Sequence, residues 1–139
     1  MTRKTLQQII DENPEAETFR FGDNRALCDE ILALVRSGAK TATCEAVRHF
    51  GEDGDAWPEV GRRDIALNWD GTPALTIETV SVETRRWSQM DEDFVAAQGE
   101  FRDLAHWQQG YRRYFERNGG WSEDMKIMCE RFRIIEDYA

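Results

Sequence analysis

Apolar residues recur every three or four positions in four stretches of the chain, with polar residues between them. This period places the apolar side chains on one face of a helix and is typical of helices that pack against a core. The pattern predicts four helices, over 5–13, 24–37, 90–98 and 104–118. The last of them carries an aromatic stripe, which consists of Leu104, Trp107, Tyr111, Tyr114 and Phe115.

The ends of these helices are marked by small polar residues and by glycine. A side-chain oxygen at the N-cap accepts a hydrogen bond from a free backbone N–H, and glycine adopts the left-handed conformation that closes a helix. The sequence therefore predicts N-caps at Asp23, Ser88 and Asp103, and helix ends at Gly38 and Gly99.

Four other stretches are rich in β-branched residues or alternate apolar and polar positions, as strands do. They predict strands from Lys40 to about Phe50, and over 63–69, 74–86 and 125–135. The turn sequence DGTP joins the second and third strands into a hairpin. In the third strand, Leu75, Ile77 and Thr79 alternate with Thr76, Glu78 and Val80, so we expect one buried face and one wet face.

The predicted order of elements is α–α–β–β–β–α–α–β, which lacks the regular alternation of a doubly wound sheet. We therefore expect an α+β fold with a mixed or mostly antiparallel sheet, curled into a barrel and flanked by helices. With 139 residues and no linker or repeat, the chain fits one domain, 1–139.

The composition limits the classes of partner that the protein can bind. The net charge of −9 opposes the phosphate neutralisation that a long duplex requires, so no long duplex nucleic acid is expected. A small substrate, or a short single-stranded RNA held in a local basic groove, is compatible with this charge. No apolar run is long enough to span a bilayer and no signal peptide is evident, so we expect no membrane partner and a cytoplasmic location.

Cysteine and histidine give no sign of a metal or a cofactor. Cys28, Cys44 and Cys129 are far apart and form no CxxC pair, and His49 and His106 are also well separated. Buried free thiols are the simplest interpretation of the cysteines. We expect no metal site and no cofactor.

The segment SGAKTATC (37–44) is the first candidate for chemistry. Lys40 can be a solvated lysine at a helix C-terminus, where a cation is favoured. Alternatively, a desolvated Lys40 can serve as a base for a neighbouring hydroxyl, that of Thr41 or Thr43. Positions three apart in a regular strand point to opposite faces, so Lys40 and Thr43 converge only if Lys40 belongs to the turn or a bulge intervenes.

Three further sites are candidates for binding or catalysis, and each has a structural alternative. Glu100 lies in a loop between two helices, where functional groups often occur, but it is also one of 27 acidic residues. Trp57 can stack on a base or cover a barrel mouth. In YRRYFER, Tyr111, Arg112 and Arg113 can contact a nucleotide, or the aromatic residues can be core and the arginines a solvated face.

Taken together, these blocks resemble the ASCH domain family, whose fold is related to the PUA domain. The resemblance covers about Phe19 to about Glu136, and its most specific element is Gly38-x-Lys40-x-x-Thr43, which matches the family motif GxKxx[ST]. It implies a PUA-like β-barrel flanked by helices and an intracellular role in RNA or nucleoside metabolism. The chain is longer than the minimal family member and has an N-terminal helical extension over about 1–18.

The resemblance also implies a catalytic set. Some small bacterial members are amidohydrolases that remove the acyl group from N4-acetylcytidine with a lysine, a threonine three residues later and a glutamate in a later loop. Lys40, Thr43 and Glu100 match these positions. The chain departs from the family at Gln98, where an acidic residue is common, and at Phe101, which adds bulk.

The leading hypothesis is therefore a hydrolase that removes an acyl group from a modified cytidine nucleoside. In it, Thr43 attacks the acyl carbonyl, Lys40 accepts the hydroxyl proton, and Glu100 orients Lys40 or assists the leaving amine. Other family members are ribonucleases or RNA-binding modules. The alternative is thus a protein that cleaves or binds single-stranded RNA, in which Lys40 and the arginines contact phosphates and Trp57 or Tyr111 stacks on a base.

Overall fold

The computed structural model describes residues 4–139, so residues 1–3 of the expected N-terminal extension lie outside the described part. Helices and strands are α1 (Leu6–Glu12), β1 (Thr18–Phe19), α2 (Arg25–Ser37), β2 (Ala42–Ala46), β3 (Arg63–Leu67), β4 (Pro73–Arg86), α3 (Glu92–Gln98), α4 (Leu104–Arg117) and β5 (Lys126–Asp137). Two short 3-10 helices follow β2 and β4, at Val47–His49 and Trp87–Gln89. The α+β class predicted from the pattern is confirmed.

The helix ends follow the predicted chemistry with two shifts in position. Gly38 and Gly99 close α2 and α3 in the left-handed conformation, and Asp103 caps α4. Asn24, not Asp23, caps α2. Asp91 caps α3, because the predicted cap Ser88 lies within the preceding 3-10 helix.

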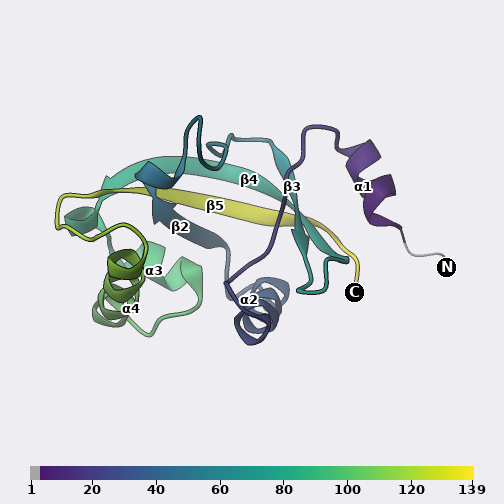
Figure 1. Cartoon of the computed structure of the whole chain (residues 1–139). Coiled ribbons are helices and arrows are strands. Elements are labelled where there is room, and N and C mark those ends of the chain that lie inside the picture. Colours follow the sequence, from purple (N-terminus) through teal and green to yellow (C-terminus); the bar gives the residue numbers. More distant parts are fainter. Residues whose placement is uncertain (1–3) are drawn as a thin grey trace.

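The strands form one five-stranded sheet in the order β1-β3-β4-β5-β2. The pair β1–β3 is parallel and the other three pairs are antiparallel. The long strands β4 and β5 cross the molecule side by side and carry the sheet from one end to the other (Figure 1). Within residues 4–139 no pairing joins β1 to β2, so the sheet is open and the predicted closed barrel is not shown.

Three strand predictions need correction, and the first is that the two-residue strand β1 was not predicted. The strand expected from Lys40 to Phe50 is shorter, because a 3-10 helix begins at Val47. The first half of β4 was expected to have a wet face, but Thr76 there is buried. One face of β4 packs under α2 through Leu75 and Ile77, and on the other face the Thr76 hydroxyl meets Tyr138 at 2.7 Å.

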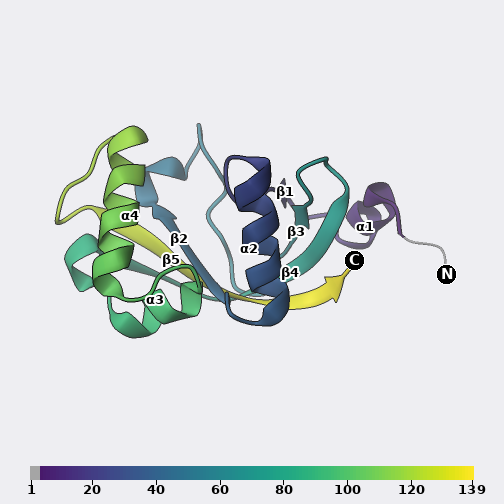
Figure 2. The ribbon, with the colours of Figure 1, turned by 90° about the horizontal axis from the view of Figure 1, so that it is seen from below.

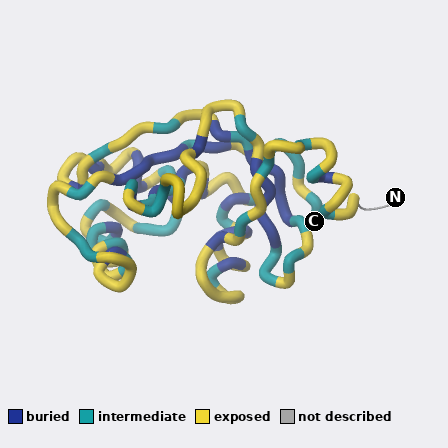
Figure 3. The backbone as a smooth tube through the Cα atoms, turned by 45° about the horizontal axis from the view of Figure 1, so that its top comes forward, coloured by how far each residue is buried: buried dark blue, intermediate teal, exposed yellow. Residues whose placement is uncertain are grey.

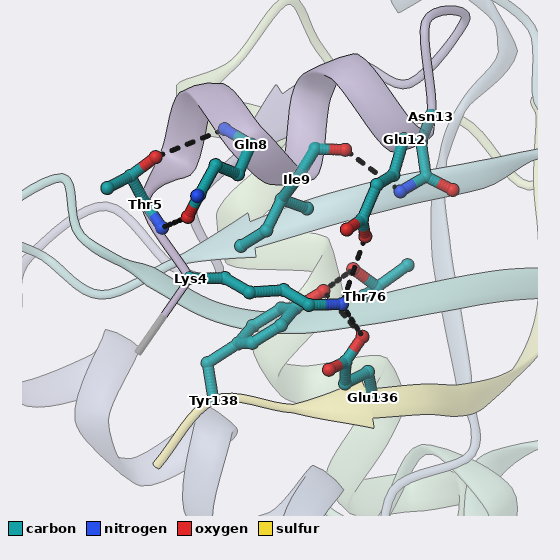
Figure 4. Close-up of polar contacts among 9 residues, drawn as sticks. All are labelled: Lys4, Thr5, Gln8, Ile9, Glu12, Asn13, Thr76, Glu136 and Tyr138. Carbon is teal, nitrogen blue, oxygen red and sulfur yellow. Dashed lines mark hydrogen bonds and ion pairs between the residues drawn. The ribbon is translucent and has the colours of Figure 1, made fainter. Parts of the chain in front are cut away.

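Helix α1 packs at one end of the sheet, on the face opposite α2. Its buried residue Ile9 clusters with Ile65 and Leu67 of β3. Lys4 adds ion pairs to Glu136 of β5 (3.2 Å) and to the helix's own Glu12 (Figure 4). This helix is therefore packed against the sheet rather than projecting from it.

The other helices cover the remaining core. Figure 2 shows α2 beside the pair α3 and α4, and the buried residues run along the strands beneath them (Figure 3). Ala42, Cys44 and Cys129 pack under α3 and α4, and we call this side of β2 and β5 the α3–α4 face. Phe132 lies three positions after Cys129, so it points to the other side of β5, where it packs under α2. We call that side of β2 and β5 the α2 face.

Candidate functional site

Lys40 is buried at the free edge of β2. Its side chain is only 2% exposed, and the Nζ atom donates to the backbone oxygens of Ala42 (2.8 Å) and Gln98 (3.4 Å) and to Glu100 Oε2 (2.7 Å). These three acceptors match the three N–H donors of an ammonium group. The solvated C-cap alternative is therefore wrong, and Lys40 forms an ion pair with Glu100.

Glu100 is held in place by the end of α3. Gly99 closes that helix at φ +72°, and a Cβ at this position would lie 2.5 Å from the carbonyl oxygen of Ala39. This close backbone approach brings the loop after α3 against the residue that precedes Lys40 in the chain. The Glu100 side chain remains 20% exposed, so the pair joins a buried cation to a carboxylate that reaches solvent.

Thr43 belongs to a different side of β2. Ala42 and Cys44 lie on the α3–α4 face, and alternation along the strand puts Thr43 on the α2 face. It lies directly opposite Glu130 of β5 in the register. No hydrogen bond joins Thr43 to Lys40 or Glu100 within the described residues, so the structure brings the lysine and the glutamate together but leaves the threonine apart.

Thr41 lies between these groups in sequence and is exposed. Its backbone N–H donates to Ala97 O at 2.8 Å, which ties the start of β2 to α3. A cavity of about 220 Å³ opens beside it, lined by Val35, Gly38, Lys40, Thr41, Phe132, Arg133 and Ile134. This volume suits a small ligand better than a drug-sized one. Thr43 and Glu100 do not line it.

The three candidates on α4 have different environments. The ring of Tyr111 stacks on Trp107 at 5.1 Å and also contacts Phe101, and burial raises its pKa well above the usual value, with the nearby Glu100 adding to the effect. Arg112 pairs with Glu116 and lies 3.9 Å from the centroid of the Trp121 ring. Arg113 is exposed. Tyr111 thus belongs to the packed aromatic cluster, as its structural alternative predicted.

Trp57 is partly exposed, at 38%, in the loop between β2 and β3. Its ring packs edge-on against Phe50 at 5.2 Å. Its carbonyl oxygen accepts from Arg62, which also holds Asp64 of β3. Since Asp64 pairs with Ile77 in the sheet, this contact links the Trp57 loop to the α2 face.

The two residues that depart from the family pattern lie around the ion pair. Gln98 is fully buried; its backbone oxygen meets Lys40, while its side-chain Oε1 lies 3.6 Å from Cys44 Sγ. A glutamate in the same position would put a carboxylate beside a buried thiol. Phe101 packs on Tyr111 and so extends the aromatic cluster toward the loop that carries Glu100.

Sequence reasoning missed a polar group on the α2 face. Glu130 is buried, and its Oε2 accepts from the Thr79 hydroxyl at 2.7 Å. Burial raises the pKa of Glu130, while the Thr79 hydrogen bond opposes the shift. One signal could have revealed it. Glu130 lies two positions from both Met128 and Phe132 along β5, so it shares their face of the strand, which is otherwise apolar.

A model of the ASCH domain family matches residues 17–136. The chain belongs to the ASCH domain family. The resemblance seen in the sequence is thereby confirmed, and the match begins after α1. No curated protein matches the chain.

Two solved structures are similar to this ASCH domain. One is an ASCH domain from Lactobacillus crispatus JV V101, with 28% identity and a TM-score of 0.80 over 92% of this chain and 84% of the other. The other is protein EF3133 from Enterococcus faecalis V583, with 26% identity and a TM-score of 0.80 over 96% and 91%. Such neighbours support a PUA-like arrangement of the open sheet.

Two further features of the fold bear on partners. No helix within residues 4–139 has the length and apolar character needed to cross a membrane. In the same residues, no group of three or more histidine, cysteine, aspartate or glutamate side chains is placed to hold a metal ion.

Proposed function

We propose that this ASCH domain is a hydrolase that removes an acyl group from the N4 amine of a modified cytidine nucleoside. Family membership supports an RNA-related role. The observation that carries the finer proposal is the buried Lys40–Glu100 pair, because the resemblance to the family's amidohydrolases implies that their chemistry uses these two positions. A fixed cation near the strand that presents the Thr43 hydroxyl can stabilise the negative charge that develops in acyl transfer.

In this proposal Thr43 attacks the acyl carbon and the carbonyl oxygen becomes negatively charged. Lys40 stabilises that oxygen through its charge and not by a hydrogen bond, because its three N–H donors are engaged, and Glu100 positions Lys40 through their 2.7 Å contact. The three acceptors around Lys40 favour this role over that of a base, since a base must have an unprotonated nitrogen free to accept a proton. The residue that takes the proton of Thr43 is considered below.

A small nucleoside fits this molecule better than an RNA chain. The net charge of −9 repels a polyanion, and two of the predicted RNA contacts are engaged elsewhere, Tyr111 on Trp107 and Arg112 on Glu116. Trp57, partly exposed in its loop, is the residue we propose for stacking on the base.

Hydrolysis of N4-acetylcytidine, followed by the ultraviolet shift on deacylation, tests the proposal. We expect turnover by the wild type and a loss of about 100-fold in kcat for Lys40→Met, the scale of removing one group that stabilises an oxyanion. Lys126→Met is the matched control, because Lys126 is exposed at the start of β5. Absence of turnover in the wild type, or full activity of Lys40→Met, contradicts the proposal. Binding of single-stranded RNA without turnover supports the alternative.

A further inference from the structure

We propose that Glu130 is the general base that removes the proton from Thr43, so that the nucleophile and its base both lie on the α2 face of the sheet. The inference rests on the proposed function, since it assigns a step of the same reaction. It assigns to Glu130 the role of base, which sequence reasoning had given to Lys40, and leaves Thr43 as the nucleophile.

The register of the sheet brings the two groups together. Thr43 of β2 and Glu130 of β5 are direct partners, and side chains of such partners have Cβ atoms about 5 Å apart on the same face. Within the described residues no hydrogen bond joins the two side chains, but a threonine hydroxyl and a glutamate carboxylate can span that distance. Lys40, by contrast, uses its Nζ atom at the outer edge of β2.

The Glu130 carboxylate has one oxygen committed and one available. Oε2 accepts from Thr79, whose partner in the register, Phe132, lies on the α2 face. Among the described residues, Oε1 has no hydrogen-bond partner. The Thr79 contact therefore fixes the carboxylate while leaving an oxygen for the hydroxyl of Thr43.

The charged groups around Glu130 suit a base. Asp64 of β3 raises its pKa and the neighbouring Arg62 lowers it, but burial is the largest influence and raises it. A carboxylate with a raised pKa takes a hydroxyl proton more readily than an exposed one does.

The step is an ordinary acyl transfer with water as the second reactant. Thr43 Oγ bonds to the acyl carbon as its proton moves to Glu130, and the C–N bond then breaks while that proton passes to the leaving amine. Water attacks the resulting ester, gives a proton to Glu130, and releases the carboxylic acid as Thr43 takes the proton back.

The experiment measures the reactivity of Thr43 directly and needs no nucleoside. p-Nitrophenyl acetate is added to the protein, and acetylation of Thr43 is followed by peptide mass spectrometry across pH. We expect labelling of the wild type, and labelling slowed by at least about tenfold in Glu130→Gln, since general bases contribute 10²–10⁴-fold. Glu136→Gln is the matched control, a carboxylate near the far end of β5.

A second variant tests the role of Glu130 even if Glu130→Gln does not fold. Thr79→Val removes the hydrogen bond that lowers the pKa of Glu130, so the acidic limb of the labelling rate should move to higher pH. A merely structural role of Glu130 would leave that limb in place. An unlabelled Thr43, labelling of a folded Glu130→Gln within about tenfold of the wild type, or an unmoved limb in Thr79→Val overturns the inference.

These outcomes are independent of the substrate. Failure to hydrolyse N4-acetylcytidine contradicts the proposed function and leaves the labelling of Thr43 to decide the role of Glu130. Conversely, turnover that persists while Glu130→Gln labels normally supports the proposed function and rejects this base.

Discussion

At the scale of single residues, Glu130 is a buried carboxylate on an apolar face. A group whose charged form is disfavoured by burial binds its proton more tightly in the folded protein than in the unfolded chain. Glu78 on the neighbouring strand is the opposite case, because hydrogen bonds from Arg133 and Arg63 lower its pKa. The same sheet thus holds two glutamates with opposite pH behaviour.

The two glutamates predict opposite trends in stability. Between the unfolded pKa of Glu130 and its raised folded pKa, the folded state binds more protons, so the free energy of unfolding falls as pH rises. Glu130→Gln removes this loss, and its stability relative to wild type should increase from pH 4 to pH 7. Glu78→Gln should show the reverse, because the stability from the ionised Glu78 is present above its unfolded pKa and is lost on acidification. Urea unfolding at several pH values measures both; equal trends for the two variants would contradict the assignment.

At the scale of elements, the contact between the end of α3 and the start of β2 builds the site. Gly99 both closes α3 and lies against the backbone of Ala39, and Thr41 donates to Ala97 in the same region. The Lys40–Glu100 pair therefore depends on how closely a helix end approaches a strand, as well as on its own electrostatic attraction.

Two glycines with the same backbone conformation separate these effects. Gly38→Ala has φ +84° and open space around the new Cβ, so we expect a loss of about 1 kcal/mol in the free energy of unfolding. Gly99→Ala adds a clash with the Ala39 carbonyl, which should cost roughly 1–3 kcal/mol more and reduce hydrolysis by displacing Glu100. Urea denaturation and the nucleoside assay measure these losses. Equal destabilisation by the two substitutions would show that the close approach of Gly99 to Ala39 does not contribute to the free energy of unfolding.

At the scale of the whole molecule, the excess of negative charge selects among RNA-derived substrates. A neutral nucleoside has no long-range interaction with this field, whereas an oligonucleotide is repelled, and added salt screens the repulsion.

This repulsion predicts a salt effect that depends on substrate length. From about 50 mM to about 500 mM salt, kcat/KM for N4-acetylcytidine should change by less than about twofold, while kcat/KM for an acetylated ten-nucleotide RNA should rise. A fall for the oligonucleotide would instead indicate phosphate contacts, as in the RNA-binding alternative.

Much of this molecule could be predicted from periodicity and from helix caps. The four helices, the glycine ends of α2 and α3, and the four longer strands follow from local pattern, whereas the two-residue strand β1 was not predicted. The open edge of the sheet could not be predicted, because whether β1 reaches β2 depends on long-range curvature. For the same reason the burial of Thr76 was missed, since it requires α1 to cover a face that alternation assigns to solvent.

For the site, the ion pair could be anticipated from the family motif, but the place of Thr43 could not. Strand alternation indicated the difficulty, and the regular register of β2 on β5 shows no bulge that would bring Thr43 toward Lys40. The partner that the register supplies, Glu130, is 87 residues away in sequence, and no local pattern links the two.

The place of Lys40 at the rim of the sheet has a consequence for the behaviour of the protein in solution. β2 is an outer strand, and exposed outer strands offer carbonyl groups on which strands of other molecules can assemble. The ammonium of Lys40 occupies one such carbonyl, that of Ala42, and so makes it less available to a strand of another molecule. Substitution of Lys40 therefore frees this carbonyl as well as removing the cation of the proposed reaction.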